Sequence, residues 1–260
     1  MLGTLYAVVL SNDDIFLIKG DPSGRRKFAD IILSQISADY LNALQNYKQV
    51  LREKNFLLKS ENIKDNLLDT YNQQQALYGT KLIAGRHKLT VRLSLQSGEI
   101  FKKFSRGNDE FMILYKSIFE IDEKTDTDSI YKAFFSELDA LKNKEKKRKV
   151  SLAGPHLDDF EIMINGKPAR AFGSEGQKRA GAVALKIAEY NIAAEKFKEP
   201  PLVLVDEVFG ELDNQKKEFL NEVFDKRAQM FITCTDEKNT GSLSSGARKY
   251  RVENGKITKI

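Results

Sequence analysis

The sequence has one cysteine, no tryptophan and no long apolar run. Because the single thiol of Cys234 cannot form a disulfide within the chain, the composition favours a reducing compartment. No apolar stretch approaches the roughly 20 residues that a membrane-spanning helix needs. The apolar opening from Leu5 to Leu10 is too short for a secretion signal and lacks a basic leader. We therefore expect a cytoplasmic protein with no membrane partner.

Basic side chains only slightly outnumber acidic ones. The 42 basic and 37 acidic side chains give a net charge of +5, and 41% of the 260 residues are hydrophobic. Such a chain can bury a sizeable core and suits one or two domains. The basic surplus permits binding to a phosphate backbone, but it fits a merely solvated basic surface equally well.

A phosphate-binding loop is also missing. That loop requires Gly, four residues and then Gly-Lys-Ser/Thr. Gly166-Lys167 is followed by Pro168, Gly255-Lys256 is followed by Ile257, and neither pair has the upstream Gly. The segment from Gly20 to Gly24 continues with two arginines. We therefore expect the nucleotide-cradling half of any ATP site to be absent from these residues.

The middle of the chain shows helical periodicity in two stretches. Side chains that are apolar or aromatic, apart from Gln75, recur at steps based on three and four residues, namely Tyr40, Leu44, Tyr47, Leu51 and Leu58, then Tyr71, Gln75, Tyr78, Leu82, Leu89 and Leu93. Lys54 interrupts the first stripe, and a break at 60–65 separates the two. They predict a helical hairpin with packing seams, too short for an extended coiled coil.

Strand patterns flank this helical region. Apolar runs at 6–10 and 111–115 predict strands, and a helix is expected at 129–141, before the basic run 142–149. We interpret that run as a solvated boundary, with a DNA-facing patch as the alternative. Asn-Gly pairs at 165–166 and 254–255 predict tight hairpin turns between short strands, the first hairpin extending to Phe172. The chain is thus predicted to be α/β, with a remnant of a head at 1–30, a helical lobe at 31–148 and the rest of the head at 149–260.

Two carboxylates follow an apolar run that is typical of a parallel strand buried on both faces. Leu202 to Val205 leads directly into Asp206 and Glu207. At the carboxyl edge of a sheet, Asp206 could hold Mg²⁺ through water and Glu207 could activate an attacking water. Taken alone, the pattern fits an acidic helix cap better.

A Gly-flanked loop opens a long amphipathic helix. Ser174, Gly176 and Gln177 stand at its start, followed by Lys178 and Arg179. Backbone N–H groups at such a helix start can approach a phosphate, and the helix dipole favours negative charge there. A capping box formed by Ser174 and Gln177 is the structural alternative, and the two interpretations are compatible.

Two further motifs follow in order. Gly210 to Asp213 places another carboxylate on a turn near Asp206, and the expected buried strand at 230–235 ends in the hydroxyls of Thr233 and Thr235, where a nucleotide-sensing switch would lie. This order of motifs predicts the second half of an ABC-type (RecA-like) ATPase head interrupted by a helical lobe.

These motifs resemble those of the RecF family, which is related to the heads of SMC-type ATPases. The resemblance rests on residues 13–30, 154–159 and 206–220, and it extends from near Met1 to near Asp236. It implies an ATPase that uses ATP and Mg²⁺, dimerises around ATP and binds single-stranded or gapped duplex DNA. It further implies recombinase loading at gaps with RecO and RecR, within DNA replication, recombination and the SOS response.

The resemblance also implies residue roles. The signature motif, contacting nucleotide held by the opposing subunit, would be Ser174, Gly176 and Gln177; the Walker B pair would be Asp206 and Glu207, and the D-loop acid Asp213. DNA-contact candidates are Arg25, Arg26, Lys146, Lys147 and Arg148. His156 receives no role and is expected to be structural.

In the family, the phosphate-binding loop lies upstream of the point that matches Met1, so we expect a chain that lacks the N-terminal part of the head. Two functions remain open from the sequence. One is an ATP-dependent repair protein whose full form carries that loop, and the other is a truncated, non-hydrolysing module that binds DNA or a protein.

Overall fold

The computed structural model describes residues 5–105, 107–122, 125–207, 219–220, 222–224, 227–235 and 246–260. Helices and both parallel and antiparallel strand pairs occur, so the α/β prediction is confirmed. The chain divides into two compact units. One contains residues 3–14 and 189–260, and the other is essentially residues 15–188. The predicted boundaries near residues 30 and 148 stay a prediction.

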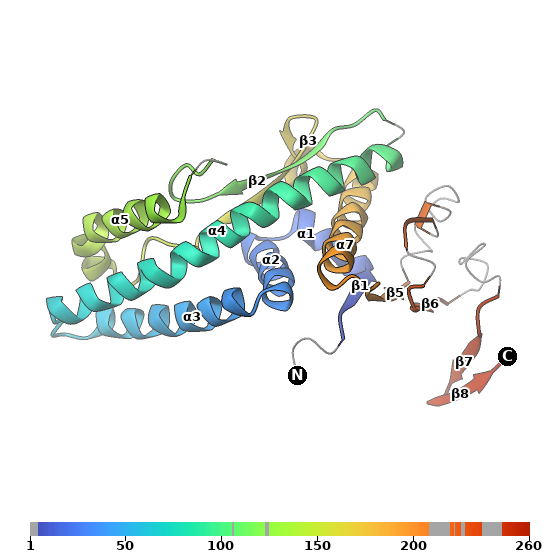
Figure 1. The fold of residues 1–260 in the computed structure, drawn as a ribbon, viewed down its shortest axis with the longest axis horizontal. Helices are drawn as coiled ribbons and strands as arrows, with labels where there is room; N and C mark the ends of the chain where they lie inside the picture. Colours follow the sequence, from blue (N-terminus) through green and yellow to red (C-terminus); the bar gives the residue numbers. More distant parts are fainter. Residues whose placement is uncertain are drawn as a thin grey trace. The chain divides into compact units, whose positions relative to one another are not determined.

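The unit of residues 15–188 is built on a helical hairpin. Its first helix is α3 (Ala38–Lys59) and its second is the 40-residue α4 (Asp65–Phe104). Figure 1 shows α3 and α4 lying side by side, with α5 (Thr127–Arg148) along α4. The predicted hairpin and its break are confirmed, and most of both predicted stripes is buried in the seam.

Shorter elements complete this unit. They are α1 (Phe16–Lys19), α2 (Pro22–Ile36), β2 (Phe111–Lys116), β3 (Asp159–Ile164), β4 (Lys167–Pro168) and α6 (Ala169–Phe172). The strands form an antiparallel sheet in the order β2-β3-β4, which packs on α4. Helix α7 (Glu175–Phe197) then begins. The helix expected at 129–141 is longer than predicted, because α5 includes the basic run 142–148 and ends at Arg148. The next residue, Lys149, has the left-handed conformation.

The first predicted hairpin is confirmed at its turn but not in its length. Asn165 and Gly166 both have positive φ, as a tight two-residue turn requires. The second strand was expected to reach Phe172, but β4 has two residues and α6 follows. Pro168 has no N–H to donate to a strand ladder, so the pairing ends there.

The unit of residues 3–14 and 189–260 holds a parallel sheet in the order β1-β5-β6. Its strands are β1 (Ala7–Ser11), β5 (Leu202–Asp206) and β6 (Met230–Thr233), and a separate hairpin joins β7 (Tyr250–Glu253) to β8 (Lys256–Lys259). Asn254 and Gly255 form the turn of that hairpin with positive φ, as predicted.

The parallel sheet is buried on one face only, which corrects two expectations. Val203 and Val205 of β5 are buried, but Leu202 and Leu204 between them are partly accessible. Phe231 of β6 is 53% exposed, so β6 is not the buried strand that was predicted. Val9, Leu204 and Phe231 are register partners, so the open face carries a row of apolar side chains across the three strands.

No helix within the described ranges is long and apolar enough to cross a bilayer.

Candidate functional site

The carboxyl ends of the three parallel strands bring together a row of polar side chains. Ser11 of β1 pairs with Asp206 of β5, which in turn pairs with Thr233 of β6. The Thr233 hydroxyl donates to Asp206 Oδ1 over 2.5 Å. Open α/β sheets bind ligands at this edge. The predicted Walker B aspartate and one predicted switch hydroxyl are therefore in direct contact.

Glu207 adopts an unusual backbone conformation directly after β5. Its φ of 56° lies in the left-handed region, which costs about 1 kcal/mol or more for a non-glycine residue. Its N–H donates to the Thr233 carbonyl at 3.3 Å, which holds this bend against β6. The Asp206 and Glu207 side chains are both exposed, as is Thr235. Asp213 and Gly210 lie outside the described residues.

Asp206 and Thr233 offer oxygen atoms to a hard cation, the ligand type that Mg²⁺ prefers. Within the described ranges, no group of three or more His, Cys, Asp or Glu side chains could hold a metal ion. Mg²⁺ usually keeps several waters and is held by one or two carboxylates, which is the kind of ligand that Asp206 offers.

The first turn of α7 is closed by a reciprocal capping box between Ser174, which precedes the helix, and Gln177 within it. The Ser174 N–H donates to Gln177 Oε1 at 2.9 Å, and the Gln177 N–H donates to Ser174 Oγ at 3.2 Å. Ser174 and Gly176 remain exposed. A Cβ added at Gly176 would meet no atom within 4 Å, so packing within the chain does not require glycine there. The missing side chain instead leaves room for a ligand to approach the backbone.

A third residue fixes the capping box from outside. Gln177 Nε2 donates to Asp109 Oδ2 at 3.0 Å, and Asn165 Nδ2 donates to Asp109 Oδ1 at 2.7 Å. Gln177 thus uses both ends of its amide within the chain. The surface offered to a ligand consists of Ser174, Gly176 and the backbone N–H groups between them.

Charge around this loop is arranged in ion pairs. The Glu175 carboxylate pairs with the ammonium of Lys19, and Lys178 lies 3.8 Å away. The hydrogen bond from Lys19 lowers the pKa of Glu175, so Glu175 remains ionised at neutral pH. A carboxylate in the first turn also stabilises α7 through the helix dipole.

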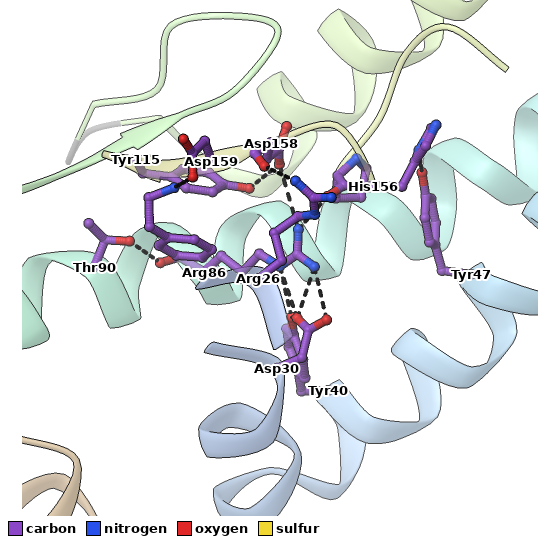
Figure 2. A network of polar contacts seen from close by, with 12 residues as sticks. Arg26, Asp30, Tyr40, Tyr47, Arg86, Thr90, Tyr115, His156, Asp158 and Asp159 are labelled. Carbon is purple, nitrogen blue, oxygen red and sulfur yellow. Dashed lines mark hydrogen bonds and ion pairs between the residues drawn. The ribbon is translucent and has the colours of Figure 1, made fainter. Parts of the chain in front are cut away.

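An arginine-centred network joins α2, α3 and α4 to the segment before β3 (Figure 2). Arg86 of α4 donates to both carboxylate oxygens of Asp30 at 2.9 and 3.0 Å. It also donates to the Tyr40 hydroxyl at 3.2 Å and to the Pro155 carbonyl at 2.5 Å. Arg86 is 3% exposed, so this bidentate pair satisfies a buried charge.

Two aspartates extend the network to β3. Tyr115 donates to the buried carboxylate of Asp158, and Arg26 donates to the Asp158 carbonyl at 2.7 Å. Burial raises the pKa of Asp158, while the Tyr115 hydrogen bond opposes that rise. Arg25 donates hydrogen bonds to both carboxylate oxygens of Asp159, at 2.7 and 2.9 Å. The motif 154–159, singled out in the sequence, therefore connects the helical hairpin to the small sheet.

His156 lies in the same segment with its ring against α3. The Tyr47 hydroxyl is 2.7 Å from His156 Nδ1, a contact that Figure 2 shows. Burial lowers the pKa of His156 to about 4, and a backbone hydrogen bond at Ser151 opposes that shift. The ring is therefore neutral at pH 7 and holds a structural hydrogen bond.

A fully buried ion pair was missed by sequence reasoning. Lys54, the interruption in the first helical stripe, lies 2.8 Å from Glu145 of α5, and both side chains are 0% exposed. Lys54 also donates to Gln75 Oε1 at 2.8 Å, and Glu145 accepts from the Leu152 N–H at 2.8 Å. The interruption itself was the available signal, since a lysine within an apolar seam needs a buried partner.

The DNA-contact candidates have different surroundings. Arg25 is 8% exposed and bound to Asp159, and Arg26 is half-buried beside Asp158. Lys146 pairs with Asp65 at the start of α4, whereas Lys147 and Arg148 are exposed at the end of α5.

No family model matches the chain, but individual proteins do. It is 37% identical to the DNA replication and repair protein RecF of Acetivibrio thermocellus over 260 residues, which are 98% of this chain and 70% of that one. Solved structures of the recombination mediator protein RecF in the RecFOR pathway superimpose on all of it. The RecF-ATPrS structure gives a TM-score of 0.90 at 30% identity, covering 69% of that chain. The RecF-ATP structure gives 0.89 at 28% identity, covering 68%.

Proposed function

Because this chain belongs to the RecF family, we propose that it serves DNA replication, recombination and repair as an ABC-type ATPase. In this proposal it dimerises around ATP on single-stranded or gapped DNA and loads recombinase there with RecO and RecR. The observation that carries the proposal is the exposed loop at Ser174 and Gly176, closed by its own capping box and with open space where a side chain would be.

An exposed loop of this kind suits a nucleotide that a second subunit holds. The hydroxyl of Ser174 and the N–H groups at the start of α7 would donate to its phosphates, and the helix dipole adds positive potential there. Gln177 would shape the loop, because both ends of its amide are bound within the chain.

The strand-end carboxylates would serve the nucleotide on this subunit. Asp206, oriented by Thr233, would hold Mg²⁺ through water, and the ion when bound would neutralise charge on the phosphates. Glu207 would accept a hydrogen bond from the attacking water and take its proton as the water oxygen bonds to the γ-phosphorus, while the bond from that phosphorus to the β–γ bridging oxygen breaks and ADP leaves with the electron pair. The Glu207 backbone, bent at a φ of 56° and hydrogen-bonded to the Thr233 carbonyl, would orient the carboxylate after the strand. Asp213 remains the D-loop candidate.

The test is ATP hydrolysis by the full-length protein in the presence of DNA. Glu207→Gln should lower kcat by about 10² or more, the contribution typical of a general base. It should leave ATP binding intact, because the amide keeps the size of the side chain. Ser174→Ala should weaken ATP-dependent dimerisation, measured by sedimentation.

Each of these results has an opposite that rejects a part of the proposal. Unchanged hydrolysis in Glu207→Gln removes the general-base role. Tight DNA binding with no affinity for ATP in the full-length protein replaces the proposal with a non-hydrolysing binding module.

A further inference from the structure

One face of α3 carries basic side chains around an exposed aromatic ring. Lys48, Arg52, Phe56 and Lys59 follow one another at intervals of four, four and three residues, so they lie along one side of the helix. Phe56 is 80% exposed. We call these four residues, with Lys27 of α2, the α3 face.

Two hollows open on this face and share residues. The first, of about 630 Å³, is lined by Lys48, Leu51, Arg52, Asn55, Phe56 and Lys59. The second, of about 590 Å³, also contains Lys48 and Leu51 and extends between α2 and α3 to Arg26, Lys27 and Tyr47. The hollows thus form a continuous surface along α3.

The charge of this surface is strongly one-sided. The first hollow has no carboxylate among its lining residues, and the second has only Asp30, which Arg86 neutralises through three hydrogen bonds. Among the residues that the structure describes, none forms an ion pair with Lys27, Lys48, Arg52 or Lys59. These cations are therefore available to a polyanion.

We propose that the α3 face binds single-stranded nucleic acid, with the cations on the phosphates and a base stacked on Phe56. A row of phosphates complements the unpaired cations, and an exposed aromatic ring between them provides a stacking platform. A closed duplex cannot use that ring, because its bases are already stacked within the helix. From Lys48 to Lys59 the helix rises about 16 Å, which is long enough to contact several successive phosphates of one strand.

The inference deepens the proposed DNA-repair function by placing a strand-binding surface away from the nucleotide-contacting loop. It does not depend on ATP, so its test is separate. Binding of labelled oligothymidylate and of a duplex of the same length is measured by fluorescence anisotropy without nucleotide. Loss of ATP hydrolysis with oligothymidylate binding intact would count against the proposed ATPase function alone. Loss of oligothymidylate binding with ATP hydrolysis intact would count against the α3 face alone.

The expected results differ between the aromatic ring and the charges. Phe56→Ala should weaken oligothymidylate binding about tenfold, with little effect on the duplex or on the salt dependence. Replacing Lys48, Arg52 and Lys59 together by Gln should reduce the slope of log K against log salt by about 2, since each single-strand phosphate contact contributes about 0.7. The matched controls are Leu95→Ala and Lys88→Gln, exposed positions on α4, which should bind as the unaltered chain does.

Three results would overturn the proposal. The first is oligothymidylate affinity that is unchanged in both variants. The second is an equal loss of single-strand and duplex binding in Phe56→Ala, which would show that the ring does not act by stacking on an unpaired base. The third is binding of a glutamate-rich peptide that both variants abolish while oligothymidylate binding persists, which would assign the face to an acidic protein. Thermal melts of every variant establish that the fold is retained.

Discussion

Asp109 accepts a 3.0 Å hydrogen bond from Gln177, the third residue of α7, across 68 residues of sequence. Its other carboxylate oxygen accepts from Asn165 in the turn of the β3–β4 hairpin. The loop that opens α7 is therefore fixed to the small antiparallel sheet and not only by its own capping box.

Asp109→Ala should loosen this loop with little effect on overall stability. Losing one part-buried acceptor costs about 1 kcal/mol. The amide hydrogen of Ser174, which donates to the Gln177 side chain, should exchange with solvent faster. Hydrogen exchange measured by mass spectrometry over residues 170–180 checks this. The control is Glu99→Ala, which removes an exposed carboxylate of α4. Unaltered protection in Asp109→Ala would show that the capping box holds without support.

Two glycines beside the loop should respond in opposite ways to alanine. At Gly173 a Cβ would lie 2.8 Å from the Ala169 carbonyl oxygen, so Gly173→Ala should destabilise the protein by about 1 to 3 kcal/mol. At Gly176 the space is open, and Gly176→Ala should leave stability unchanged or raise it by up to about 1 kcal/mol. Urea unfolding gives both values.

The effect of Gly176 on ATP hydrolysis can then be separated from its effect on the stability of the protein. If ligand access is the reason for glycine, Gly176→Ala should lower ATP hydrolysis by the full-length protein although the fold is at least as stable. A Gly176→Ala protein that hydrolyses ATP normally would contradict that role.

Removing one partner of the buried ion pair should be costly. Lys54→Met leaves the Glu145 carboxylate buried without its cation and should lower the free energy of unfolding by about 3 to 5 kcal/mol. Adding Glu145→Gln removes the stranded charge and keeps an oxygen for the Leu152 N–H, so much of the loss should be recovered. A double variant no more stable than Lys54→Met would contradict this.

Stability should fall as the pH is lowered from about 6.5 to about 5 because of His156. Its pKa is about 4 in the folded protein, lowered first by burial and then by the charges of Lys54 and Arg26, while Glu145 acts the other way. Over this range the unfolded chain takes up a proton on this ring and the folded chain does not, so protons favour unfolding.

The loss should reach about 1 to 2 kcal/mol between these pH values, given about 1.4 kcal/mol per pH unit for one proton. Unfolding of His156→Gln, compared with the unaltered chain at each pH, isolates this contribution. Parallel pH profiles for the two proteins would contradict it.

Local sequence signals predicted the elements that depend on local chemistry. Both Asn-Gly turns, the helical hairpin and the helix that begins after Ser174 follow from turn conformation, periodicity and capping. The strand end at Asp206 was also predictable, because an apolar run followed by carboxylates marks a parallel strand reaching a ligand-binding edge.

The remaining features depend on partners far away in the sequence. Nothing near Lys54 identifies Glu145 as its partner, and nothing near Gln177 identifies Asp109. The open face of the parallel sheet was missed for a related reason. The apolar run of β5 looks the same whether one or both faces are covered, and Phe231 shows that only one is.

The length of α4 has a mechanical consequence. A helix of 40 residues is about 60 Å long, so a tilt of about one degree moves one end by about 1 Å relative to the other. At its start, Asp65 and Asp69 are clamped by Lys146 and Lys142 of α5. The C-terminal end of α4 lies five residues before Asp109, which accepts a hydrogen bond from Gln177. Helix α4 thus spans the distance between the basic end of α5 and the residue that supports the start of α7, so any tilt of this helix would displace one of these ends relative to the other.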